Sequence, residues 1–233
     1  MHAFLMIGQS NMAGRGIIQD VEPIRNGHLH VLRNGRWQPF FVPVNPDRPF
    51  AGITLAESFA DLYQRDHDAE TGLIPCADGG TCLEDWRENG ILFDHAVFQT
   101  RLAMRTSSIR GILWHQGESD CTETGFRFYR DRLEHFYEAL IRATGLGEVP
   151  FLAGGLGDFL EARPEEGPYL GEMNRQIESF ASSHTYTAFV DASGLPGLSD
   201  HLHFTAAAQR ELGRRYYAAY RNLESGFSRG FVS

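Results

Sequence analysis

Five short apolar segments recur along the chain, and each is bounded by glycine, proline or polar residues. They lie at Ala3–Ile7, Gly72–Ala77, Gly111–Trp114, Phe151–Gly154 and Thr187–Val190. Apolar runs of this length, bounded by turn-forming residues, predict buried β-strands. The sequence therefore predicts a core of five strands.

The stretches between these segments carry apolar residues at helical spacing. In residues 54–66, for example, Leu55, Phe59 and Leu62 fall on one face of a helix. Similar spacing predicts helices at about Phe93–Arg105, Phe126–Ala143, Tyr169–Ser182 and Thr205–Leu223. The segment Ile17–Phe50 is less regular and rich in proline, and we interpret it as a long surface loop near the site.

Strands that alternate with helices predict βαβ units, and hence a parallel sheet with helices on both faces. We expect a three-layer α/β/α sandwich around a five-stranded parallel sheet, flavodoxin-like in general shape. No repeat and no interdomain linker is visible, so we expect one domain over residues 1–233.

The composition narrows the class of protein. Hydrophobic residues at 42% and charged residues at 22% are typical of a globular domain. The net charge of -9, with no dense Lys/Arg run, argues against a nucleic-acid partner, and no apolar run is long enough for a membrane span. We expect a soluble protein that either is cytoplasmic or is secreted by a signal absent from this sequence.

The three cysteines, Cys76, Cys82 and Cys121, are odd in number and form no CxxC pair, which indicates free thiols. Their number and spacing give no sign of a disulfide framework.

Polar loops follow the predicted strands, where an open parallel sheet places its sites. GQSN follows the first strand, ADGGT the second and HQGESD the third, while SDHLHF precedes the last helix. Because carboxyl ends of parallel strands meet at one edge, we expect these loops to converge.

Two of these loops contain the parts of a serine hydrolase. Serine needs a base to take its proton, and the base needs a group that orients it. Ser10 lies in a glycine-bearing turn after the first strand, and Asp200 precedes His203 by three residues. In a loop that enters a helix, this spacing lets the carboxylate reach Nδ1 and leaves Nε2 for the serine. Each feature alone is explained equally well as a turn residue or helix cap.

An oxyanion hole needs donors aimed at the oxygen that becomes negative when the ester is attacked. Gly80 and Gln116 are the candidates, the first through its backbone N–H and the second through its side-chain NH₂. Turn geometry and a loop hydrogen bond are the alternative explanations for these two residues.

Together the motifs resemble a known family, the sialate O-acetylesterase and carbohydrate esterase family six (acetylxylan esterase-like) branch of the SGNH hydrolases. The motifs are GQSNMAG (Gly8–Gly14), GGT (Gly79–Thr81) with Trp86, WHQGESD (Trp114–Asp120) and DHLHF (Asp200–Phe204), and they span nearly the whole chain.

The resemblance implies an SGNH hydrolase fold and a role for each motif. Ser10 is then the nucleophile, and Asp200 and His203 complete the triad. The Ser10 and Gly80 N–H groups and the Gln116 side chain form the oxyanion hole. The general SGNH pattern has aspartate at Gln9 and asparagine at Gln116, and the two glutamines are what this acetylesterase branch shows.

Further candidate site residues are Gln9, Asn11 and Glu118. Glu118 is an alternative or additional partner for the histidine, although a loop carboxylate bonded to backbone N–H groups explains it equally well. Asn11 is a rim residue or a helix cap. Arg15 is a plausible rim residue that we leave out of the site.

The pairs His28/His30 and His201/His203 have strand spacing suited to a metal, but no third ligand accompanies either pair at typical spacing. We therefore expect no metal site.

The sequence thus predicts a serine esterase that removes O-acetyl groups from a carbohydrate through an acyl-enzyme, with no cofactor or metal. The partner is an acetylated carbohydrate, and neither the sugar, the acetyl position nor an oligomeric state is indicated. A short-chain esterase for a non-sugar substrate and a catalytically silent carbohydrate-binding protein are the alternatives. Every catalytic position carries a residue type that can perform its role, which argues against a protein without catalytic activity.

Overall fold

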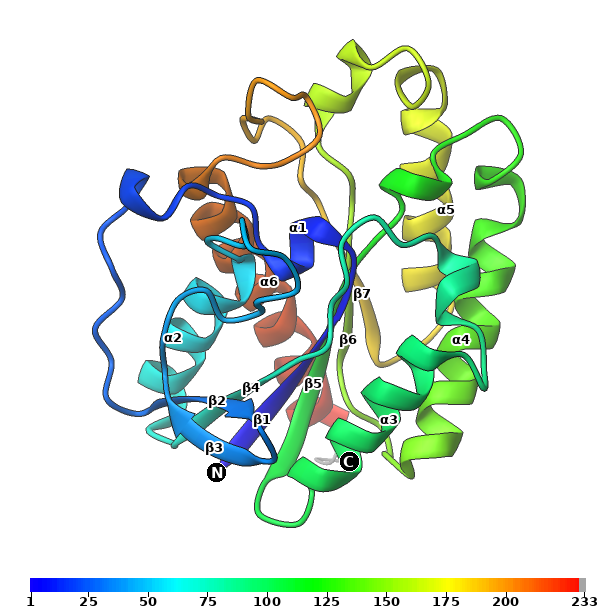
Figure 1. Ribbon diagram of the computed structural model, residues 1–233. Coiled ribbons are helices and arrows are strands. Elements are labelled where there is room, and N and C mark those ends of the chain that lie inside the picture. The colour runs from blue at the N-terminus through cyan, green and yellow to red at the C-terminus, as the bar shows by residue number, and fades with distance from the viewer. Residues whose placement is uncertain (231–233) are drawn as a thin grey trace.

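The computed structural model describes residues 1–230, and within them a seven-stranded sheet is covered by helices on both faces (Figure 1). The order across the sheet is β3-β2-β4-β1-β5-β6-β7. All neighbouring strands are parallel except β3, which is antiparallel to β2. The strands are β1 (His2–Gly8), β2 (Leu29–Arg33), β3 (Arg36–Pro39), β4 (Thr71–Pro75), β5 (Ser108–His115), β6 (Phe151–Gly154) and β7 (Thr187–Val190).

Most helices connect one parallel strand to the next. They are α1 (Ser10–Ala13), α2 (Leu55–His67), α3 (Ile91–Ala103), α4 (Tyr129–Thr144), α5 (Leu170–Ala181) and α6 (Ala206–Gly230). Short 3₁₀ helices lie in the connections at Ile18–Asp20, Leu83–Trp86, Glu118–Asp120, Phe126–Phe128, Asp158–Ala162 and Gly167–Tyr169. No helix within residues 1–230 is both long enough and apolar enough to cross a membrane.

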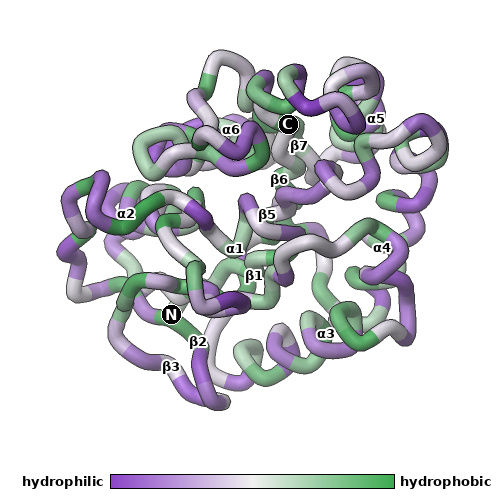
Figure 2. The backbone as a smooth tube through the Cα atoms, turned by 45° about the horizontal axis from the view of Figure 1, so that its top comes forward, coloured by the Kyte–Doolittle hydropathy of each residue, from purple (hydrophilic) through white to green (hydrophobic). Residues whose placement is uncertain are grey.

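Strand β1 lies between the two hydrophobic cores, which explains its continuous apolar run. Leu5 and Ile7 pack into the core beneath α3, α4 and α5, whereas Phe4 and Met6 pack into the core beneath α2 and α6. Successive strand residues point to opposite faces, so a strand covered on both sides is apolar throughout. Figure 2 shows α2 and α6 on one side of the strands and α3 and α4 on the other, with hydrophobic and hydrophilic residues mixed along each helix.

The three-layer fold with a central parallel sheet is confirmed, but the predicted strand count of five is wrong. The two additional strands, β2 and β3, come from the segment that we interpreted as a surface loop. They form a hairpin whose turn is Asn34-Gly35, with φ of 52° and 75°. Two consecutive left-handed residues fit the tight turn that matches the twist of a hairpin.

The carboxyl ends of β1 and β5 approach each other closely at the edge where the predicted site lies. A Cβ at Gly8 would lie 2.1 Å from the carbonyl oxygen of His115, and Gly8 has φ of +128°. Only glycine meets both conditions. The serine loop is thereby held directly against the HQGESD loop.

Candidate active site

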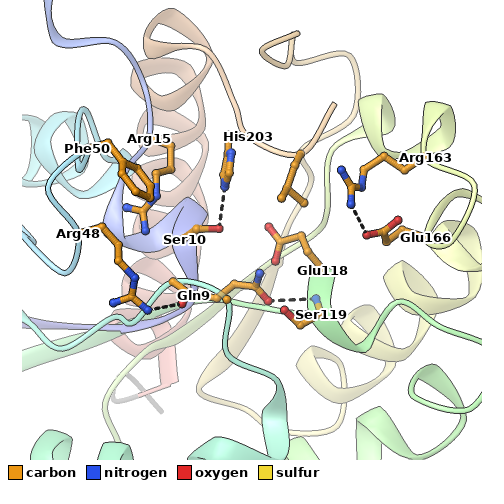
Figure 3. Close-up of a pocket in the computed structure, with 13 residues that line it drawn as sticks. Gln9, Ser10, Arg15, Arg48, Phe50, Glu118, Ser119, Arg163, Glu166 and His203 are labelled. Atoms are coloured by element: carbon orange, nitrogen blue, oxygen red, sulfur yellow. Dashed lines mark hydrogen bonds and ion pairs between the residues drawn. The ribbon is translucent and has the colours of Figure 1, made fainter. Parts of the chain in front are cut away.

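Ser10 stands at the start of α1, immediately after β1 ends. Its side chain opens into a cavity of about 400 Å³, shown in Figure 3. The cavity is lined by Gln9, Ser10, Arg15, Arg48, Phe50, Gly79, Gly80, Glu118, Ser119, Arg163, Glu166, Leu202 and His203. All four polar loops singled out in the sequence contribute to this lining, so they do converge.

The structure brings Ser10, His203 and Asp200 into one hydrogen-bonded line. His203 Nε2 lies 3.1 Å from Ser10 Oγ, and His203 Nδ1 lies 2.6 Å from Asp200 Oδ2. The ring is thus held at one nitrogen and presents the other to the serine, which is the arrangement of a nucleophile, base and orienting acid.

A local turn holds the Asp200 carboxylate in place. Its Oδ1 accepts hydrogen bonds from the backbone N–H of Leu202 at 2.9 Å and of His203 at 3.1 Å. Partial burial opposes ionisation, but these backbone bonds and the His203 ring hold the pKa of Asp200 below its ordinary value. Asp200 is therefore anionic at neutral pH, as an orienting acid must be.

Two residues that line the cavity, Ser10 and Gly80, have backbone N–H groups that remain available as donors. Within residues 1–230, neither the Ser10 N–H nor the Gly80 N–H donates to another protein group. Gly80 lines the cavity with φ of +81°, and a Cβ there would meet no atom within 4 Å. The open space next to Gly80 lets a ligand oxygen approach its backbone.

Gln116 lies behind the cavity wall rather than on it. Its side-chain Nε2 is 2.7 Å from Asp120 Oδ2 and 3.1 Å from the carbonyl oxygen of Thr81. The side chain is fully buried and is absent from the cavity lining. The role of Gln116 as an oxyanion donor stays a prediction, and this geometry does not favour it.

Asn11 joins the serine loop to the histidine loop. Its Nδ2 donates to the Leu202 carbonyl at 3.0 Å and to Glu118 Oε1 at 2.5 Å, and its Oδ1 accepts from Phe204 N–H at 3.2 Å. Asn11 is completely buried. These contacts fix the chain on both sides of His203.

Glu118 is a buried anion that faces the cavity. His115 Nε2 lies 3.6 Å from its Oε1, while its Oε2 has no hydrogen-bond partner. Burial would raise the pKa of Glu118, but the close approach of His115 and the Asn11 amide lower it below its ordinary value. No hydrogen bond joins Glu118 to His203 within the described residues.

The sequence did not identify the charged and aromatic wall of the cavity. Arg15, which we had left out, pairs with Asp47 at 2.6 Å, and Phe50 lies over its guanidinium at 5.2 Å. Arg48 pairs with Asp78, and Arg163 with Glu166. Arg48 and Phe50 come from the proline-rich segment, where no motif marked them.

The two His-x-His pairs lie in different parts of the molecule. His28 and His30 approach the two oxygens of Glu70, at 2.7 and 3.3 Å. His203 belongs to the line described above, and His201 adopts φ of 53° in the same turn. Over residues 1–230, no three His, Cys, Asp or Glu side chains are grouped as a metal site. The three cysteines are free.

A family model described as carbohydrate esterase, sialic acid-specific acetylesterase, matches residues 1–222. A curated relative from Arabidopsis thaliana, described as "Probable carbohydrate esterase", is 27% identical over 93% of this chain and 89% of its own. The solved structure of that plant protein superposes with a TM-score of 0.85 at 26% identity, covering 95% of this chain and 98% of the other.

More distant solved structures share the fold. NanS has a TM-score of 0.76 at 16% identity, covering 97% of this chain and 98% of its own. A carbohydrate acetylesterase from Xanthomonas citri has a TM-score of 0.72 at 19% identity, and the match covers 96% of this chain and 57% of that one.

Proposed function

The chain belongs to the sialic acid-specific acetylesterase family of carbohydrate esterases, and we propose that it removes O-acetyl groups from a carbohydrate through an acyl-enzyme on Ser10. Membership makes the chain a carboxylic ester hydrolase, and the resemblance inferred from the four motifs is confirmed. The serine mechanism and the roles of single residues belong to the proposal.

One observation carries the proposal, namely the line from Ser10 Oγ through His203 to Asp200, which opens on the cavity. Without a base, the serine hydroxyl is a poor nucleophile at neutral pH. His203 Nε2, at 3.1 Å, is within reach of the hydroxyl proton, and the anionic Asp200 stabilises the imidazolium that forms on proton transfer.

In the first step, Ser10 Oγ bonds to the acetyl carbon while His203 Nε2 takes the hydroxyl proton. The carbonyl oxygen becomes an anion next to the Ser10 and Gly80 N–H groups. Collapse of this intermediate breaks the bond to the sugar oxygen, which receives the proton from His203. Acetyl-Ser10 and the free sugar hydroxyl result.

Water then repeats the same steps on the acetyl-enzyme. His203 takes a proton from water, the hydroxide oxygen bonds to the acetyl carbon, and the second oxyanion collapses with return of the proton to Ser10 Oγ. Acetate leaves, and the resting enzyme is restored.

The cavity wall supports a carbohydrate as the alcohol half. Arginine and glutamate side chains, together with Ser119, offer donors and acceptors to sugar hydroxyls, and Phe50, 68% exposed, offers one aromatic face. Acetylated sialic acid, the substrate in the family description, and acetylated xylan are the two sugar classes to compare.

The test is Ser10→Ala assayed with p-nitrophenyl acetate, acetylated sialic acids and acetylated xylan. We expect turnover to be abolished with all substrates, because the nucleophile is removed. The circular dichroism spectrum should be retained, because the fold loses only one hydroxyl at a cavity wall. A variant that keeps most of the wild-type kcat would overturn the assignment of the nucleophile.

Ser107→Ala is the matched control. Ser107 donates to the Ala103 carbonyl at the end of α3 and directly precedes β5, so it lies at the amino end of the strands, whereas Ser10 lies at their carboxyl end. It loses the same hydroxyl without touching the cavity, so its kcat should equal that of the wild type.

A further inference from the structure

We propose that Phe50 is a stacking platform for the pyranose ring of the substrate, and thus a residue that selects the alcohol half of the ester. The proposal rests on the proposed function, since it takes the leaving alcohol to be a sugar. Phe50 belongs to none of the four motifs and is the last residue of the proline-rich segment Ile17–Phe50.

Phe50 combines exposure with a place at the cavity. Its exposed fraction is 68%, and it lines the cavity that contains Ser10. A single exposed apolar residue is ordinary on a protein surface, so exposure alone indicates no ligand. Over residues 1–230, the other exposed large apolar side chains lie outside this lining, namely Met1, Ile17, Ile18, Ile91, Phe98, Met104 and Phe128.

The Phe50 ring is supported on one face by a fixed guanidinium. Arg15 Cζ lies over the ring, 5.2 Å from its centroid. Arg15 is buried, and its two terminal nitrogens donate to the two carboxylate oxygens of Asp47 at 3.0 and 2.6 Å. A bidentate pair of this kind fixes the plane of the guanidinium. One face of the ring is thus covered by Arg15, and the exposed fraction of the side chain leaves the opposite face for a ligand.

Backbone hydrogen bonds join the residues after Phe50 to the end of the serine loop. The Gly52 N–H donates to the Gly14 carbonyl at 3.0 Å, and Gly16 and Ile53 exchange two hydrogen bonds at 3.2 and 2.8 Å. A binding group is precise only when its supporting chain is held by such contacts. The position of Phe50 relative to the nucleophile is therefore set by the fold.

Gly79 shows how close this support lies to the nucleophile. A Cβ placed on Gly79 would lie 2.3 Å from an Arg15 guanidinium nitrogen and 3.4 Å from Ser10 Cβ. The guanidinium that carries the Phe50 ring is thus part of the wall next to Ser10. Figure 3 shows Phe50 next to Arg15, on one side of Ser10.

A pyranose ring matches a flat aromatic surface at this place. Its hydroxyls project from the rim, so the faces of the ring present C–H groups. These groups pack on the face of an aromatic ring, where the π electrons carry a partial negative charge, and both surfaces are removed from water. The ester oxygen is attached at the rim, so it can face Ser10 while the ring lies on Phe50.

Three variants separate stacking from mere apolar cover. Phe50→Ala removes the side chain, Phe50→Leu keeps an apolar side chain without a flat ring, and Phe50→Tyr keeps the ring. The quantity measured is the ratio of kcat/KM for a sugar acetate to kcat/KM for ethyl acetate. The sugar acetate is an acetylated methyl xyloside or an O-acetylated sialic acid, whichever the wild type cleaves faster. Because the acetyl group is common to both esters, the ratio reports on the alcohol half alone.

If Phe50 is a platform, the ratio falls about tenfold in Phe50→Ala and in Phe50→Leu, mainly through a higher KM for the sugar acetate, and Phe50→Tyr stays within about twofold of the wild type. Thermal melts check that the variants are folded, as expected for changes at an exposed side chain.

Phe98→Ala is the matched control. Phe98 is 61% exposed in α3 and lies outside the cavity lining, so the same change there should leave the ratio at its wild-type value.

An unchanged ratio in Phe50→Ala would overturn the proposal. A wild-type ratio in Phe50→Leu would overturn it as well, because apolar cover would then be sufficient. Either result leaves the acyl-enzyme intact if Ser10→Ala, assayed in parallel, is inactive. If the wild type cleaves ethyl acetate but neither sugar acetate, the carbohydrate part of the proposed function is wrong, and the platform is wrong with it.

Discussion

Two carboxylates lie near His203, and their surroundings assign them different tasks. Asp200 contacts the ring at Nδ1 and is anchored by backbone N–H groups of its own turn. Glu118 lines the same cavity but is bonded to Asn11 and paired with His115 rather than with the His203 ring. The Asp-x-x-His spacing makes the first contact within one short turn, at little cost in loop entropy.

We expect Asp200→Asn to lower kcat strongly with an unchanged fold. The change keeps the shape of the side chain but removes the charge that orients and stabilises the imidazolium, and in serine proteases it costs about 10⁴ in kcat. The loss should be smaller here, because an acetyl ester is cleaved more easily than a peptide. Measurement of kcat for p-nitrophenyl acetate, with thermal melts, checks this.

Glu118→Gln is the matched comparison, since it also exchanges one carboxylate oxygen for NH₂. It should reduce kcat less than Asp200→Asn and lower the melting temperature, because buried His115 loses its anionic partner. If Glu118→Gln is the more damaging change and Asp200→Asn is nearly silent, then Glu118 is the orienting acid.

Residue roles were predictable from the sequence only where spacing determines contact. The pair Asp200 and His203 meets within one turn, so a motif reveals it. The orientation of the Gln9 amide depends on N–H groups more than a hundred residues away in the chain, those of Gly117 and Ser119. Arg48 and Phe50 reach the cavity through a loop path that no local pattern encodes.

At the level of elements, the central strands were predictable because burial on both faces leaves a continuous apolar run. Strand β2 is covered less fully, and β3 at the sheet edge is largely polar, so neither shows such a run. Asn34-Gly35, between two short alternating segments, is the signal that was available for this hairpin. The proline-rich surroundings obscured it.

Gly35→Ala should lower the free energy of unfolding by about 1–2 kcal/mol, because an L-residue is strained at φ of 75°. Chemical denaturation measures the change, and kcat should be unaffected. Gly147→Ala is the control, because a Cβ there meets no atom within 4 Å and the residue lacks a positive φ, while a Cβ at Gly35 makes only an ordinary contact with Leu102 at 3.9 Å. Equal stability of the two variants would contradict the strained-turn explanation.

At the level of the whole molecule, the site is assembled from segments near the two ends of the chain. Ser10 and His203 are separated by 193 positions, and the Asn11 bonds to Leu202 and Phe204 tie the same two segments together. The sheet edge is what brings them into contact. The chain carries a net charge of -9, yet Arg15, Arg48 and Arg163 line the cavity, each paired with a carboxylate.

The residues of this cavity wall also limit the length of the acyl group that the site can bind favourably. Leu202 and Phe50 are the large apolar side chains in the lining, and the remainder is charged, polar or glycine. A long acyl chain gains about 0.8 kcal/mol for each methylene that it buries, which corresponds to roughly a fourfold increase in kcat/KM. A wall that is interrupted by arginine and glutamate provides no continuous groove in which to bury such a chain.

We therefore expect kcat/KM to be highest for acetate and to fall or stay level along a series of p-nitrophenyl esters from acetate through butyrate to octanoate. The alcohol half is constant in this series, so the comparison isolates the acyl side of the cavity. Methylenes that are not buried contribute no binding energy and can clash with the wall, so a longer acyl chain should not raise kcat/KM. A rise of about fourfold per methylene would reveal an apolar acyl groove and contradict a cavity suited to acetyl groups.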